Sequence, residues 1–165
     1  MQSKQRIWFA GILLLGLIWI FVSADSSGAS TNGLIPAPQK GFLAPDFTLE
    51  TLSGETVALS DLRGQVIIVN LWASWCGPCR LEMPAFKEVY NEYKARGLVI
   101  LAVNSTSQDT RAAVERFVAE YQLPFPIPLD TKGEAARLYR LSALPSTFFI
   151  GRDGVITKVV IGGPL

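Results

Sequence analysis

Histidine is absent from all 165 residues of this chain, and cysteine occurs only twice. Without histidine, the chain lacks the usual base of Ser-His and Cys-His catalysis and the imidazole ligands of haem and metal centres. Two cysteines are too few for a multi-disulfide scaffold. A zinc site commonly needs four Cys or His ligands, so one protomer could complete such a site only with carboxylates or water. We therefore expect no metal and no other cofactor.

An excess of either charge is also absent, since 15 Lys and Arg residues stand against 14 Asp and Glu residues. No basic stripe indicates a nucleic-acid partner. The length leaves room for one domain of ordinary size besides one membrane-like segment. We expect this domain to be monomeric.

A long apolar run stands near the N-terminus, where Lys4 and Arg6 precede the uncharged residues 7–22. A helix of this length spans roughly 24 Å, slightly less than a hydrocarbon core of about 30 Å. The run therefore fits both a signal peptide, with a cleavage site at Val22-Ser23-Ala24, and a membrane anchor. We expect an uncleaved anchor over residues 1–22, with the rest of the chain outside the cytoplasm.

Residues 23–40 are rich in Ser, Gly, Ala and Pro and predict a flexible linker, so the folded domain is expected over residues 41–165. Within this domain, apolar and β-branched runs predict strands at 47–49, 57–59, 66–72, 98–103, near 129, at 146–150 and at 155–161. Amphipathic patterns predict helices at 79–96, 109–121 and 133–141. The order of these elements predicts an α/β fold, a mixed β-sheet flanked by helices.

The spacing of apolar residues also predicts which side of each long helix is buried. In the helix over 79–96, the buried side should consist of Phe86, Val89, Tyr90 and Tyr93. In the helix over 109–121, it should consist of Ala113, Phe117 and Val118.

Both cysteines lie in Trp75-Cys76-Gly77-Pro78-Cys79, between the strand predicted at 66–72 and the following helix. Unpaired N–H groups and the helix dipole at the start of that helix favour a thiolate at Cys76. Pro78 suits a first turn, and Cys79 lies close enough to reach the Cys76 sulfur. This arrangement favours a redox-active dithiol. The alternatives are a zinc site, two unreactive cysteines, and a structural disulfide, which would stabilise so small a loop by only about 2 kcal/mol.

A second informative stretch, Leu144-Pro145-Ser146-Thr147-Phe148, lies far downstream of the cysteines. Together with Trp-Cys-Gly-Pro-Cys, it makes the chain resemble the thioredoxin superfamily, and most closely the membrane-anchored TlpA/ResA-type thiol-disulfide oxidoreductases with a redoxin or AhpC/TSA-like domain. The resemblance covers residues 41–162. It also includes Phe47-Thr48-Leu49, Leu59-Ser60-Asp61-Leu62-Arg63-Gly64, Asn70-Leu71-Trp72-Ala73-Ser74-Trp75 and Cys79-Arg80-Leu81-Glu82-Met83-Pro84. It implies a thioredoxin-like sheet with an N-terminal β-hairpin extension, and disulfide exchange as the reaction.

The resemblance also implies roles for individual residues. Cys76 would be the exposed nucleophile that attacks a substrate disulfide, and Cys79 would resolve the mixed disulfide. Pro145 would be a cis proline against the active site and would expose backbone groups of Leu144 to an extended substrate segment. From the sequence alone a trans bond is favoured, because only about one X–Pro bond in twenty is cis. The other substrate-binding residues would be Trp75, Gly77 and Pro78.

Glu82 has two interpretations. It is an acidic residue near the start of a helix and gains from the helix dipole. ResA-type oxidoreductases, however, place a functional glutamate at this position, which manages protons near the cysteine pair and tunes the thiol pKa. Asn70 stands where thioredoxins have a buried aspartate and cannot accept a proton, which leaves Glu82 as its replacement. We therefore count Glu82 among the candidate catalytic residues.

The Gly77-Pro78 dipeptide is the one found in thioredoxin, whose reduction potential is about −270 mV, against about −120 mV for strongly oxidising relatives. We therefore expect a reductant that works on the extracytoplasmic side of the cell membrane. By family, such an enzyme takes electrons from a transmembrane thiol donor. Its substrates would be apocytochrome c, in cytochrome c biogenesis, or other disulfide-containing exported proteins.

One departure from the family is at the C-terminus, where the sequence stops just after the last predicted strand. Relatives continue into a C-terminal helix that covers one face of the sheet, so either this sequence is a fragment or the domain is less stable than its relatives. Without it, we expect apolar residues of the strands at 146–150 and 155–161 to be partly exposed.

Three rival functions remain open. A peroxiredoxin-type thiol peroxidase shares the N-terminal hairpin pattern but needs Thr-x-x-Cys, and Ala73 stands at the threonine position. A copper-delivering protein of the same fold usually has a wider cysteine spacing and a histidine. A membrane-tethered interaction module would have inert cysteines that react slowly with a thiol reagent at neutral pH.

Overall fold

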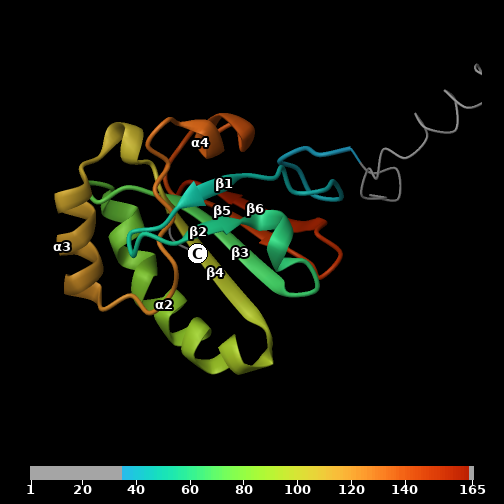
Figure 1. Ribbon diagram of the computed structural model, residues 1–165, viewed down its shortest axis with the longest axis horizontal. Helices are drawn as coiled ribbons and strands as arrows, with labels where there is room; N and C mark the ends of the chain where they lie inside the picture. The colour runs from blue at the N-terminus through green and yellow to red at the C-terminus, as the bar shows by residue number, and fades with distance from the viewer. Residues whose placement is uncertain (1–34, 164–165) are drawn as a thin grey trace, which may run out of the picture. The chain divides into compact units, whose positions relative to one another are not determined.

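The computed structural model describes residues 35–163 (Figure 1). The predicted anchor over residues 1–22, and the part of the predicted linker that precedes residue 35, lie outside the described residues. Linker residue Ala37 donates its backbone N–H to the carbonyl of Leu43 at 3.0 Å. Over residues 35–163, no helix combines the length and the apolar character that crossing a bilayer requires.

The centre of the fold is a four-stranded mixed sheet with the order β4-β3-β5-β6. Strands β3 (Val66–Trp72) and β4 (Leu98–Asn104) run parallel, whereas β5 (Ser146–Ile150) is antiparallel to β3, and β6 (Ile156–Ile161) is antiparallel to β5. All residues of β3 after Val66 are buried, as expected of an apolar run in the middle of a sheet. The predicted mixed α/β sheet is confirmed.

A short hairpin precedes this sheet. Strands β1 (Thr48–Glu50) and β2 (Thr56–Ala58) pair antiparallel around a turn in which Gly54 adopts φ +89°. A positive φ of this size favours glycine, which has no Cβ to clash. The hairpin extension predicted from the resemblance is therefore present, with each strand displaced by one residue from its expected bounds.

Helices cover both faces of the four-stranded sheet. Helices α2 (Gly77–Tyr93) and α3 (Arg111–Tyr121) lie side by side in Figure 1. They share a buried cluster with alternate strand residues such as Ile68 and Trp72. The other face is covered by α4 (Glu134–Leu138), by β1 and by the 3-10 segment Leu59–Leu62, over Ile67, Val69 and Leu71. The alternation along β3 separates the two clusters, because successive strand side chains point to opposite faces. Two further 3-10 segments are Lys94–Arg96 and Thr106–Gln108.

The predicted buried sides of the helices were partly wrong. On α2, Phe86 is buried as expected, but Val89 is 38% exposed and Tyr93 36% exposed. The buried positions are instead Cys79, Glu82, Met83 and Phe86. On α3, Val114 is buried together with Phe117, whereas Ala113 is only half-buried. Periodicity alone located the helices but did not show where along each helix the contact with the sheet ends.

The second half of α2 borders an apolar groove of about 370 Å³. Its apolar lining includes Val66 of β3, Val89 and Tyr93 of α2, and Phe149 of β5. Over residues 35–163, β6 is the last element, and no helix covers this part of the sheet. Phe149 is half-buried and Ile161 is 56% exposed, so the expected partial exposure of β5 and β6 is observed.

Two other expectations need correction. Residue Leu129 forms only an isolated bridge with Asn104 rather than part of an edge strand. Three prolines in the six residues 123–128 explain this, because proline cannot donate to a strand ladder. The helix expected over 133–141 is shorter and comprises only α4.

Candidate active site

The two cysteines lie at the junction between β3 and α2. Cys76 is the residue immediately before the helix, and Pro78 occupies its first turn. Cys79 donates its backbone N–H to the Cys76 sulfur at 3.2 Å, which is the contact expected of a helix start that stabilises a thiolate. The structure holds the pair as a Cys76–Cys79 disulfide.

The expectation of an exposed nucleophile needs a correction. Cys76 is only 4% exposed and Cys79 is fully buried. Cys76 nevertheless borders a surface groove of about 380 Å³. Its sulfur can therefore be approached from one side only, by a partner that enters this groove.

The groove has two walls that come from distant parts of the sequence. One wall is formed by residues 75–78, including Trp75, which is 59% exposed. Gln108 lies beside this wall, because its carbonyl accepts the Trp75 indole N–H at 3.0 Å, and the other wall consists of the loop 141–144. The Leu144–Pro145 peptide bond is cis, as the resemblance implied. The structure thus brings together five of the sequence-predicted residues, namely Trp75, Cys76, Gly77, Pro78 and Leu144.

Glu82 is buried beneath this site and is only 3% exposed. Its Oε1 accepts a hydrogen bond from Asn70 Nδ2 at 2.7 Å, and the same amide donates to Thr147 Oγ1 at 3.0 Å. Burial raises the pKa of Glu82 to about 7, although the Asn70 hydrogen bond acts in the opposite direction. Within residues 35–163, Asn70 Oδ1 and Glu82 Oε2 are buried without a hydrogen-bond partner. Glu82 is therefore poised to exchange a proton near neutral pH.

Asp109 is a residue near the site that the sequence did not reveal. Its Oδ2 accepts hydrogen bonds from the Ser74 backbone N–H at 2.7 Å and from Asn104 Nδ2 at 3.0 Å. Its Oδ1 accepts from Ser74 Oγ and from the Thr110 backbone N–H, both at 2.8 Å. Partial burial opposes ionisation, but these hydrogen bonds hold the pKa of Asp109 below its ordinary value.

The sequence pattern alone could not have revealed this role. An aspartate before a predicted helix indicates a helix cap. In the structure, Thr110 caps α3 by accepting the Ala113 N–H, which leaves Asp109 to bind Ser74.

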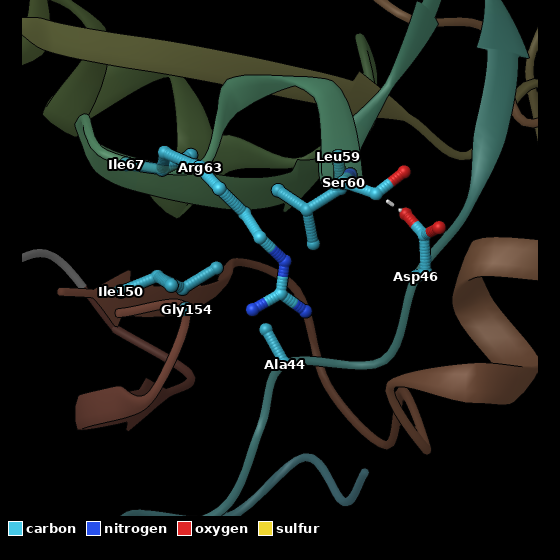
Figure 2. A pocket seen from close by; sticks show the side chains of 8 residues that line it. All are labelled: Ala44, Asp46, Leu59, Ser60, Arg63, Ile67, Ile150 and Gly154. Carbon is cyan, nitrogen blue, oxygen red and sulfur yellow. Dashed lines mark hydrogen bonds between the residues drawn. The ribbon is translucent and has the colours of Figure 1, made fainter. Parts of the chain in front are cut away.

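A second cavity lies away from the cysteines, between the chain before β1, the segment 59–63 and the β5–β6 turn (Figure 2). Its volume is about 20 Å³, enough for roughly one water molecule. The Arg63 side chain extends toward Ala44 and Gly154, and Asp46 accepts the Ser60 backbone N–H at 2.9 Å. This cavity is too small for a substrate and shares no residue with the groove beside Cys76.

Comparison with known proteins agrees with the geometry. The AhpC/TSA family matches residues 41–159. The chain is 39% identical to the thiol-disulfide oxidoreductase ResA of Oceanobacillus iheyensis over 165 residues, which cover 98% of this chain and 84% of the relative. It is 40% identical to the thioredoxin-like protein YneN of Bacillus subtilis over 160 residues, which cover 94% and 89% of the two chains.

A solved structure shows the same fold. The crystal structure of StoA from Bacillus subtilis superposes with a TM-score of 0.65 at 33% identity and covers 73% of this chain and 90% of StoA. These relatives, together with Ala73 at the position where a peroxidase needs threonine, do not favour the peroxiredoxin alternative. The paired cysteines at the start of α2 and these likenesses lead to one conclusion: the chain belongs to the AhpC/TSA family and is a ResA-type thiol-disulfide oxidoreductase.

Proposed function

We propose that this enzyme reduces disulfides in exported proteins on the extracytoplasmic side of a membrane, with oxidised apocytochrome c as the substrate class. The observation that supports this most is the Cys76–Cys79 pair at the start of α2, beside an open groove. Within residues 35–163, the backbone N–H and carbonyl of Leu144, on the far wall, make no backbone hydrogen bond. They are available to pair with an extended polypeptide.

The proposed reaction proceeds in two exchanges. The Cys76 thiolate attacks one sulfur of the substrate disulfide, forms a mixed disulfide, and displaces the other substrate sulfur, which takes up a proton. Cys79 then loses its proton and attacks the Cys76 sulfur, which releases the second substrate sulfur as a thiol. The substrate gains two electrons and two protons, and the enzyme is left with the Cys76–Cys79 disulfide.

Glu82 is the proposed acceptor of the proton that Cys79 loses. The two residues lie three positions apart on α2 and are both buried, so they occupy the same side of the helix. A carboxyl group with a pKa of about 7 exchanges protons efficiently at neutral pH. An ionised Glu82 also disfavours a thiolate nearby, which favours the disulfide form and makes the pair a better reductant.

The membrane location rests on the sequence. The uncharged run 7–22 after Lys4 and Arg6 supports an N-terminal tether that keeps the catalytic domain outside the cytoplasm. A reductant in that compartment must be regenerated, and a transmembrane thiol donor is the partner that can carry electrons across the bilayer.

The proposal is tested with reduced full-length protein and an oxidised peptide that carries the Cys-x-x-Cys-His haem site of a cytochrome c. We expect one peptide disulfide to be reduced per enzyme molecule, faster than oxidised glutathione is reduced. If glutathione were reduced and the peptide remained oxidised, the enzyme class would stand and the proposed substrate class would be wrong.

A further inference from the structure

We propose that Asp109 is a positioning residue for protein substrates, because it fixes the wall of the groove that carries Trp75. This inference requires only that the enzyme exchanges disulfides, whatever its physiological substrate. Ser74, which Asp109 binds through both its backbone N–H and its hydroxyl, immediately precedes Trp75. Asp109 itself immediately follows Gln108, which lines the groove beside Trp75.

A second bond joins the same two segments. The indole Nε1–H of Trp75 donates to the carbonyl of Gln108 at 3.0 Å. Trp75 is more than half exposed, so few packing contacts fix its orientation. The bonds from residues 74 and 75 to residues 108 and 109 therefore determine where the indole stands on its wall of the groove beside Cys76.

The four hydrogen bonds need a carboxylate. Each oxygen of Asp109 accepts from two donors, which are Ser74 and Asn104 on one side and Ser74 and Thr110 on the other. Asparagine has nearly the same shape but only one acceptor oxygen, so its NH₂ group would face two donors. Asp109→Asn thus breaks the contact with little change in volume.

The outcome should depend on the size of the substrate. A protein disulfide must contact both walls of the groove, whereas a small aromatic disulfide needs only access to Cys76. For Asp109→Asn we expect the KM for insulin reduction to rise roughly tenfold with kcat within about twofold, which corresponds to about 1.4 kcal/mol of lost binding. The rate with the small reagent DTNB should remain within about twofold of the original enzyme.

Three further measurements distinguish a positioning role of Asp109 from a general loss of structure and from an effect of its charge on Cys76. Asp46→Asn removes the same charge far from the groove, while its amide oxygen can still accept the Ser60 backbone N–H, and it should leave both rates unchanged (Figure 2). Ser74→Ala removes one of the four bonds and should raise the insulin KM by a smaller factor, even if Asp109→Asn folds poorly. The pH dependence of Cys76 alkylation should not shift in Asp109→Asn or in Ser74→Ala.

Equal losses with insulin and DTNB would overturn the proposal, since they would indicate a general loss of structure. A shifted alkylation profile would also overturn it, because Asp109 would then act through its charge on Cys76. An unchanged insulin KM in both Asp109→Asn and Ser74→Ala would show that the groove does not depend on this contact.

Discussion

At the scale of single residues, Cys76 is the proposed nucleophile although it is only 4% exposed. Its sulfur receives the Cys79 N–H and faces the groove between Trp75 and Leu144. A thiolate stabilised by a helix start but reached from one side reacts with disulfides that enter the groove and is shielded from others.

The different positions of the two sulfurs predict different consequences of their removal. Cys76→Ser should abolish disulfide reduction, because Cys79 is fully buried and cannot meet a substrate. Cys79→Ser should trap a mixed disulfide through Cys76, because no second thiol remains to resolve it. Non-reducing electrophoresis with mass spectrometry detects this adduct. A Cys76→Ser variant that still forms the adduct would reverse the assigned roles.

Glu82 makes the free energy of unfolding fall as the pH rises, which is opposite to the effect of most carboxylates. Its pKa is raised from an ordinary value near 4.5 to about 7, so the folded state favours the protonated form. The corresponding stability is fully present below pH 4.5 and is lost as the pH rises to about 7. Glu82→Gln should therefore stabilise the oxidised protein at pH 8 by about 3 kcal/mol and have little effect at pH 4.

Urea unfolding at several pH values measures this difference. Glu50→Gln, at an exposed position, serves as the control and should show no such trend. If the stability difference between the Glu82→Gln and original proteins did not change with pH, the assigned proton chemistry would be wrong. Glu82→Gln should also shift the pH dependence of Cys76 alkylation in the reduced enzyme.

The sequence identified the cysteines, Glu82 and Asn70 but not the residues that hold Asn70 and Ser74 in place. Thr147 and Asp109 act on Asn70 and Ser74, which lie on other elements, and their contacts depend on the sheet register and on the path of the loop after β4. Neither residue stands in a local pattern that differs from ordinary strand or cap chemistry. Such long-range polar contacts can be assigned only once the fold is known.

At the scale of elements, α2 is the part that places the chemistry. Its start holds Cys76, its first turns bury Cys79 and Glu82, and Met83 and Phe86 anchor it to the sheet. Its remaining turns border the open apolar groove beside β3 and β5, which is why Val89 and Tyr93 are more exposed than their spacing predicted.

Two residues on different sides of the same part of α2 allow a matched test of this orientation. Met83 is fully buried, and Met83→Ala should lower the free energy of unfolding by about 2–5 kcal/mol. Leu81 is 71% exposed, and Leu81→Ala should change it by less than about 0.5 kcal/mol. Urea titration of the oxidised proteins measures both. Similar losses in the two variants would mean that α2 is rotated relative to this description.

Strand and helix positions were largely predictable because each element carries a strong local pattern. The run Val66–Trp72 and the proline at position 78 bracket the active-site turn directly in the sequence. The segment before Leu129 was less predictable, since its prolines prevent regular pairing while the chain remains extended.

At the scale of the whole molecule, the two faces of the sheet are covered by different elements. One face of the sheet is covered by α4 and β1, and Leu141 and Leu144 of the groove beside Cys76 pack against the cluster on this face. The other face carries α2 and α3, and the active-site turn lies at the end of β3 where the loops 105–110 and 141–144 converge. The mixed sheet followed from the pattern of elements, whereas the strand order β4-β3-β5-β6 and the groove emerged only when the strands and these loops were placed.

The reduction potential of the Cys76–Cys79 pair tests the central claim most directly. It is measured by equilibrating the full-length protein with glutathione or dithiothreitol buffers and quantifying the free thiols. We predict a value near −250 mV or lower, in the range of thioredoxin at about −270 mV. A value near −120 mV would instead identify an oxidant and would contradict the proposed direction of electron flow.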